Sequence, residues 1–168
     1  IWAGFADHYL PEEAWPGLIA RLEETGDASL IAEASVVPEA GELPGLAADC
    51  TRLLSGDTLA VIRAALEADG GAFAGDMLKR MARNSPLSMA VFVEMMRRLR
   101  GQQIEDALEM EYCFVSRSME HGDFLEGIRA AIIDKDRAPK WQFSDGTVPA
   151  TAVSKMLIPL GKNALNLE

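Results

Sequence analysis

Apolar residues recur every three or four positions along most of the chain, which is the spacing of helices with one buried face. One such run covers residues 73–83. Another covers residues 86–100 and follows Ser85-Pro86, a pair typical of a helix start. The pattern predicts a mainly helical protein. Its clearest run predicts about four turns ending at Gly122, with an apolar face formed by Ile104, Leu108, Tyr112, Val115 and Met119.

Shorter runs predict further helices at residues 11–24, 46–54, 57–69 and about 149–157. A helix is also expected from Asp123, because Asp123 and Glu126 have the spacing of a capping box. Residues 35–44 and 134–141 lack helical spacing and are interpreted as a connecting loop and a charged surface turn, the latter with Trp141 anchored on apolar neighbours.

One segment has the pattern of a strand instead. Residues 4–10 alternate between larger apolar and small or polar side chains before Pro11. A single strand leaves its backbone groups without partners, so we expect either that its sheet neighbours lie upstream of Ile1 or that this segment is irregular here.

Composition narrows the class of protein. The 168 residues are 49% hydrophobic, enough for an ordinary core, without an apolar run of membrane-spanning length. The chain starts at Ile1 without a signal-peptide pattern, and we expect the natural N-terminus to lie upstream. Cys50 and Cys113 suit buried free thiols in a reducing compartment, and we expect a cytoplasmic location. With histidines only at positions 8 and 121, we expect no metal ion and no cofactor.

The charge is uneven along the chain. Residues 1–70 contain 13 acidic and 3 basic side chains, which accounts for the whole net charge of −10. Such a protein repels phosphate backbones, so nucleic-acid binding is not expected. An anionic ligand would need a local basic patch in residues 71–168, where 13 acidic and 13 basic residues balance.

Candidate catalytic residues are few. The sequence has no GxSxG elbow, GxGxxG loop or phosphate-binding GxxxxGK[ST] loop. Capping explains Asp123 and Glu126 better than acid–base chemistry does, and the dipole of the preceding helix explains the basic cluster at residues 97–100. The cluster Lys135, Arg137 and Lys140 alternates with carboxylates and suits a solvated turn. No catalytic residue is assigned.

One region nevertheless resembles a known family. Residues 123–136, DFLEGIRAAIIDKD, followed by Pro139-Lys140-Trp141, resemble the C-terminal signature of 3-hydroxyisobutyryl-CoA hydrolases in the crotonase superfamily. Residues 3–9, 84–88 and 109–112 add to the resemblance, which is loosest between residues 25 and 72. It implies a fold class: the helical C-terminal region of a crotonase-like α/β protein, divided into a core remnant at 1–10, a helical and loop segment at 11–83 and a C-terminal helical segment at 84–168.

The resemblance also implies an activity in valine catabolism, the hydrolysis of a 3-hydroxyacyl-CoA thioester. In such families, backbone N–H groups and carboxylates upstream of the segment resembling residues 4–9 perform the reaction, because negative charge develops on the thioester oxygen. This chain would then lack them. It would help to close an acyl-CoA cleft, with Phe124, Arg129 and Lys135 as candidate substrate-binding residues. Each residue also has a structural explanation: Phe124 as part of the core, Arg129 as an ion-pair partner and Lys135 as a solvated turn residue.

Two alternatives remain open. The chain could instead be the C-terminal part of an enoyl-CoA hydratase or isomerase, or an autonomous helical interaction module whose amphipathic helices meet partner helices. If a crotonase core is missing, the faces that would meet it are exposed, and we expect a homo-oligomer to cover them. No membrane partner is expected.

Overall fold

Residues 1–165 are described by the computed structural model, and they form two compact units, Ile1–Ala48 and the residues from Asp49 onward. Helices make up most of both units, and no strand occurs in this part of the chain. The prediction of a mainly helical chain is therefore confirmed. The division at residues 10 and 83 expected from the sequence stays a prediction.

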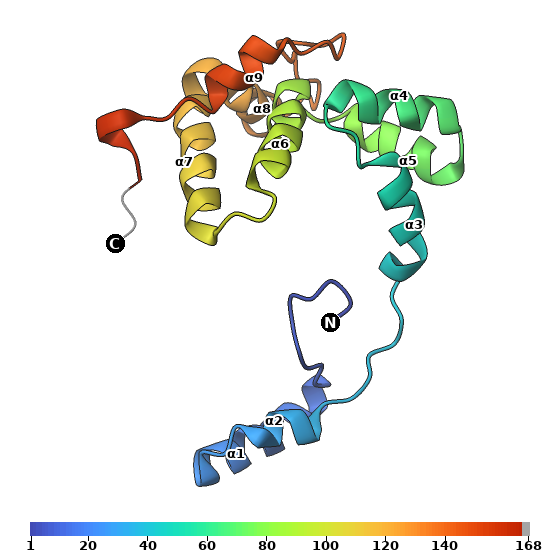
Figure 1. Cartoon of the computed structure of the whole chain (residues 1–168), viewed down its shortest axis with the longest axis vertical. Helices are drawn as coiled ribbons and strands as arrows, with labels where there is room; N and C mark the ends of the chain where they lie inside the picture. Colours follow the sequence, from blue (N-terminus) through green and yellow to red (C-terminus); the bar gives the residue numbers. More distant parts are fainter. Residues whose placement is uncertain (166–168) are drawn as a thin grey trace. The chain divides into compact units, whose positions relative to one another are not determined.

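The first unit is a pair of helices that pack on each other. A short 3-10 turn (Glu12–Ala14) leads into α1 (Trp15–Thr25), and α2 (Ser29–Ala34) follows (Figure 1). Helix α1 ends at Gly26, whose φ of 67° is the left-handed conformation that glycine adopts without strain. Leu18 of α1 and Leu30 of α2 are the buried contacts between the two helices.

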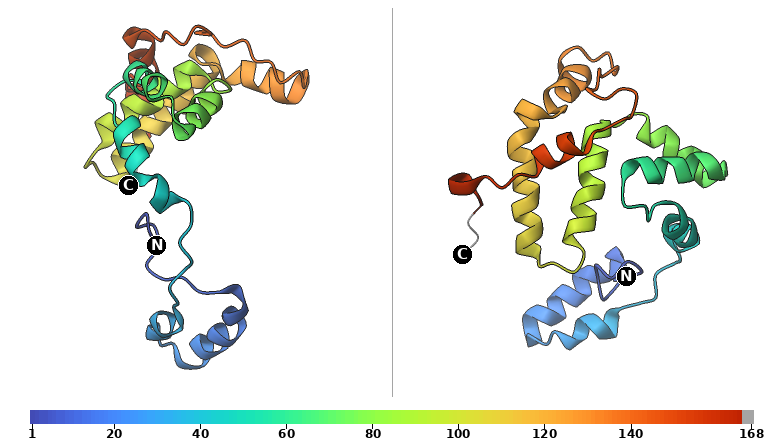
Figure 2. Two further views of the ribbon diagram at one scale, coloured as in Figure 1. Left: turned by 90° about the vertical axis from the view of Figure 1, so that its right-hand side faces the viewer. Right: turned by 45° about the horizontal axis from the view of Figure 1, so that its top comes forward.

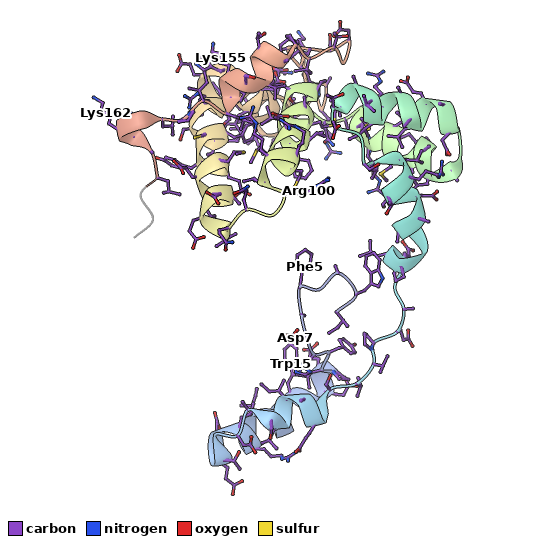
Figure 3. The ribbon with its side chains drawn as sticks, in the orientation of Figure 1. Phe5, Asp7, Trp15, Arg100, Lys155 and Lys162 are labelled. Atoms are coloured by element: carbon purple, nitrogen blue, oxygen red, sulfur yellow. The ribbon has the colours of Figure 1, made fainter. Side chains whose placement is uncertain are left out.

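The strand predicted for residues 4–10 does not form. The Val36 N–H donates to the Tyr9 carbonyl at 3.0 Å, and the Tyr9 N–H donates to Ser35 Oγ at 3.4 Å. Phe5, labelled in Figure 3, is 96% exposed. Alternation alone does not make a strand, because the ladder of hydrogen bonds needs a neighbouring strand.

The second unit contains the longer helices. Helix α3 (Leu43–Leu53) crosses from one unit into the next, and the hairpin of α4 (Leu59–Asp69) and α5 (Ala72–Met81) follows. The remaining elements are α6 (Pro86–Leu99), α7 (Ile104–His121), α8 (Phe124–Ile128), a π-helical turn (Arg129–Ile133), α9 (Ala150–Met156) and a final 3-10 turn (Gly161–Asn163).

Two apolar cores hold this unit together. Leu53, Ile62, Leu66 and Ala74 form the first, where α4 and α5 lie side by side (Figure 1). The second lies where α9 packs on both α6 and α7 (Figure 2). Its fully enclosed side chains are Leu87, Val91, Met95, Met156 and Leu157.

Helix α6 begins where the sequence predicts. The Ser88 N–H donates to Ser85 Oγ at 3.1 Å, which satisfies one of the free donors at the helix start. Helix α4 is capped by Thr58 and not by Asp57, because the Thr58 hydroxyl accepts from the Val61 N–H at 3.3 Å.

Helix α7 is present as predicted, and its apolar stripe is exposed. The apolar stripe is 40–66% exposed, while Cys113 and Ser118 are buried and Phe114 packs against the second core. Periodicity identifies an apolar face but not the element that covers it. The exposed stripe consists of Ile104, Leu108, Tyr112, Val115 and Met119.

Candidate functional site

An apolar hollow of about 570 Å³ lies where the second half of α7 meets α8, the π-helical turn and the start of α6. Val115 and Met119 of the exposed α7 stripe form one side, while Phe124 and Ile132 form another. Phe124 is 51% exposed, so its ring borders the hollow without filling a core. The hollow is large enough for a small acyl group.

The hollow also has buried polar residues in its wall. The Ser85 hydroxyl donates to Asp123 Oδ2 at 2.6 Å, and the Gln142 N–H donates to Asp123 Oδ1 at 3.0 Å. Asp123 is 5% exposed, and these bonds satisfy both of its oxygens. The network ties α6, the start of α8 and the segment after Trp141 to one another.

The capping box expected at Asp123 and Glu126 does not form. The Asp123 side chain forms no cap on α8, because it bonds to Ser85 and Gln142, and Glu126 bonds to Arg129 and Lys140. The spacing in the sequence matched, but partners distant along the chain took both carboxylates. Trp141 does lie against apolar neighbours, since its ring borders the hollow and faces the side of Gly127 where another residue would have its Cβ.

A charged cluster centred on Arg129 follows the hollow along the chain. Arg129 Nε and Nη2 donate to the two Glu126 oxygens at 2.9 and 2.8 Å. Nη1 donates to Asp134 at 2.6 Å and to Asp136 at 2.7 Å, and Nη2 also donates to the Ala138 carbonyl at 3.2 Å. These bonds engage all three nitrogens of the guanidinium group, whose five N–H donors form a planar fork.

The cluster shifts the pKa values of its members. Hydrogen bonds from Arg129, then from the Lys140 N–H, lower the pKa of Glu126 to about 2. The Ala138 N–H, then Arg129, lower the pKa of Asp136. The carboxylates, Glu126 first, raise the pKa of Arg129. All of these groups are charged at neutral pH.

The backbone around Arg129 is unusual. The Asp134 N–H reaches back five residues to the Arg129 carbonyl at 2.8 Å, which makes residues 129–133 one π-helical turn. Lys135 and Arg137 then have φ values of 56° and 54°, a left-handed conformation that side chains other than glycine rarely adopt. The loop of residues 134–140 is therefore held in a strained conformation.

The three predicted site residues fall in neighbouring places. Phe124 borders the hollow, Arg129 is the centre of the ion-pair cluster, and Lys135 is an exposed residue of loop 134–140. Whether they bind substrate stays a prediction. Sequence reasoning missed Ser85 and Asp123 in the wall of the hollow, because their contact joins residues 38 positions apart.

A second, larger groove of about 830 Å³ runs along α6 beside the start of α4 and includes Phe92, Met96 and Arg100. Arg100 lies at the end of α6 (Figure 3). Arg97 and Arg98 both pair with Glu94, and these hydrogen bonds, with Arg97 first, lower the pKa of Glu94 to about 2. Two of the three arginines in the cluster at residues 97–100 are therefore paired with one carboxylate of their own helix.

Residues 1–165 contain no group of three potential metal ligands, and no helix among them is long and apolar enough to span a membrane. The expected cytoplasmic location stays a prediction.

Comparison with protein families gives a match to the enoyl-CoA hydratase/isomerase model over residues 1–157. The chain belongs to the enoyl-CoA hydratase/isomerase family. Both the hollow and the Arg129 cluster lie inside the region that matches this family.

Two curated relatives of the chain are named as a 3-hydroxyisobutyryl-CoA hydrolase or as a protein like it. The 3-hydroxyisobutyryl-CoA hydrolase of Gallus gallus mitochondria is 32% identical over 68% of this chain and 30% of its own length. The 3-hydroxyisobutyryl-CoA hydrolase-like protein 5 of Arabidopsis thaliana is 30% identical over 82% of this chain and 40% of its own length.

A crystal structure of an enoyl-CoA hydratase from Rhodobacter sphaeroides 2.4.1 is 46% identical, with a TM-score of 0.89 over 99% of this chain and 49% of that one. The chain thus spans about half of that structure and less of the curated relatives.

Proposed function

We propose that this chain is part of an enzyme that hydrolyses the thioester of 3-hydroxyisobutyryl-CoA or a similar 3-hydroxyacyl-CoA. In this proposal the chain supplies one wall of the acyl-CoA site, with the hollow beside Phe124 for apolar parts of the ligand and the loop containing Lys135 for its charged parts. The hydrolase names among the chain's relatives support this choice of reaction.

One observation carries the proposal: an apolar hollow and a cation-bearing loop lie next to each other along α8 and the π-helical turn, with Trp141 beyond the loop bordering the hollow. An acyl-CoA thioester combines an apolar acyl end with phosphates. A site that binds it therefore needs both surfaces within one ligand length.

The groups that attack the thioester are proposed to lie outside these 168 residues. Within residues 1–165 no serine or cysteine is hydrogen-bonded to a histidine, and the buried Ser85 is paired with Asp123 instead. The Ser85–Asp123 contact is buried and has no imidazole between hydroxyl and carboxylate, so we assign it to structure.

The second candidate is an enoyl-CoA hydratase or isomerase. The similarity of nearly the whole chain, at 46% identity, to a structure described as an enoyl-CoA hydratase favours it. Both candidates use an acyl-CoA thioester, so the wall proposed here serves either reaction. They differ in the bond that changes, because hydrolysis cleaves the C–S bond and hydration adds water across a C=C bond.

Product analysis separates the two candidates. The protein that contains this chain is incubated with 3-hydroxyisobutyryl-CoA and with a 2-enoyl-CoA, and its intact mass is recorded first. We expect stoichiometric release of the CoA thiol from the hydroxyacyl ester. Loss of the enoyl absorbance without thiol release would contradict hydrolysis and support the hydratase.

We also propose that other polypeptide covers the exposed α7 stripe, either a crotonase core or further copies of this chain in a homo-oligomer. Val115 and Met119 are each 60% exposed, although they continue into the apolar hollow. Contiguous apolar surface of this kind marks an interface in soluble proteins.

A further inference from the structure

We propose that Arg129 is a positioning residue that shapes loop 134–140 into an anion-binding site formed by Lys135, Arg137 and Lys140. The ligand class is a phosphate or pyrophosphate group. The geometry and the charges of the loop support this site. The site rests on the proposed function only where the phosphate is identified as part of an acyl-CoA.

The charged side chains between Glu126 and Lys140 are only partly paired with one another. Four cations and three carboxylates lie between Glu126 and Lys140. All three carboxylates, Glu126, Asp134 and Asp136, bond to Arg129. Within residues 1–165, Lys135 and Arg137 form no ion pair, and both are exposed. The segment keeps a net charge of +1 (four cations and three carboxylates), and its unpaired cations lie on the loop surface of a protein whose net charge is −10.

The second step is the shape of the loop. A left-handed residue other than glycine is strained by the clash between Cβ and the carbonyl oxygen, so two of them within three residues require compensating contacts. Asp134 and Asp136 bracket Lys135 and both reach Arg129 Nη1, while the Arg137 N–H donates to the Ala130 carbonyl at 3.0 Å. These contacts hold the two left-handed residues in place.

The third step is the role of Arg129 itself. Its side chain is 27% exposed, and its bonds to three carboxylates and one carbonyl use its donors. Such a guanidinium has nothing left to give a ligand, so its effect on binding is exerted through the loop. Lysine offers a point charge in place of the planar fork and cannot replace it.

A double change of the two aspartates tests positioning against simple electrostatics. Asp134→Ala with Asp136→Ala keeps every cation and makes the loop more positive by two charges. A site that depended on charge alone would bind inorganic pyrophosphate more tightly. Positioning predicts binding weaker than wild type, as measured by calorimetry on the protein that contains this chain at fixed ionic strength.

The matched control is the same change around another arginine. Arg52 pairs with Asp49 and Asp69, away from the loop in sequence. Asp49→Ala with Asp69→Ala alters the net charge equally and should leave pyrophosphate affinity at or slightly above the wild-type value.

The exposed cations Lys135 and Arg137 are tested separately from Arg129. Lys135→Ala and Arg137→Ala should each weaken pyrophosphate binding about three- to five-fold, the size expected of exposed charge pairs. Arg129→Lys should weaken it as much as the two changes combined. In the wild type, the Arg129 Nη1 hydrogens, which bond to Asp134 and Asp136, should give slowly exchanging NMR signals that disappear in the double aspartate variant.

Unchanged or tighter binding by a folded Asp134→Ala, Asp136→Ala protein would overturn the positioning role. Unchanged binding by the Lys135→Ala, Arg137→Ala protein would overturn the anion site. Coenzyme A serves as a second probe: affinity above that of pyrophosphate, lost in the same variants, supports a CoA phosphate as the source, and equal affinity supports a free phosphate. In the protein that contains this chain, retained pyrophosphate binding without thioester turnover would count against the proposed function only.

Discussion

Glu126 shows how one side chain decides the conformation of a loop. Both of its oxygens accept from Arg129, and one also accepts from the Lys140 N–H at 2.6 Å, across 14 residues. A carboxylate in this position is bonded only while it is charged. The pKa of Glu126 is accordingly about 2, below its ordinary value of 4.5.

A pH dependence follows from that shift. Between pH 4.5 and about 2 the unfolded chain binds more protons at this position than the folded chain, so the contribution of Glu126 is present above pH 4.5 and disappears as the pH falls toward 2. The difference in free energy of unfolding between wild type and Glu126→Gln should therefore be largest near neutrality. Urea titrations from pH 2 to 7 measure it, with Glu94→Gln as the matched variant at another carboxylate of similar pKa. A difference for Glu126→Gln that is constant over this range would contradict the account.

For single residues, contacts between near neighbours in the sequence could be predicted, and contacts between residues distant in the sequence could not. The Ser85 cap was predicted because a capping serine bonds three residues ahead. Asp123 and Glu126 matched a local motif equally well, yet Ser85, Gln142 and Lys140 took their oxygens. Spacing along the chain contains no information about such partners.

Loop 134–140 is the element whose conformation is most constrained by its contacts. Glycine adopts the φ of 56° found at Lys135 without the clash between Cβ and carbonyl oxygen that other residues have. Lys135→Gly should therefore raise the free energy of unfolding by up to about 1 kcal/mol. Lys155→Gly, on α9 (Figure 3), should lower it by about 1 kcal/mol, because glycine is a poor helix former. Denaturant unfolding of both variants checks the opposite signs, and a loss of stability in Lys135→Gly equal to that in Lys155→Gly would contradict the strain.

Helix positions could be predicted, whereas helix surroundings could not. Helices α6 and α7 lie where their apolar spacing and their serine or glycine boundaries indicated. The six-residue helix α2 and the π-helical turn were missed, the first because it is too short to show periodicity and the second because it depends on Arg129 and its partners.

For the whole molecule, the exposed α7 stripe is the feature that most requires a partner. Val115→Lys and Met119→Lys place charge on side chains that are each 60% exposed, so the fold should keep its stability while any assembly through this surface weakens. Sedimentation velocity measures the association. Glu120→Lys, also exposed on α7 but away from the stripe, is the control and should leave assembly unchanged. Equal association of all three variants with the wild type would exclude this surface as an interface.

Family and fold class could be predicted from sequence, because a continuous signature at residues 123–141 and helical spacing are both visible in the order of residues. The hollow could not, since it is made by Ser85, Val115, Phe124 and Trp141, which only folding brings together. The missing strand shows the same limit at residues 4–10, where an alternating pattern had no neighbour to pair with.

Locating an acyl-CoA on the protein tests the central claim most directly. The protein that contains this chain is saturated with a non-hydrolysable thioether analogue of 3-hydroxyisobutyryl-CoA, and hydrogen exchange is followed peptide by peptide. The account predicts slower exchange in residues 114–141, which include the hollow and loop 134–140. Protection confined to the groove that contains Phe92 and Arg100, with residues 114–141 unchanged, would contradict it.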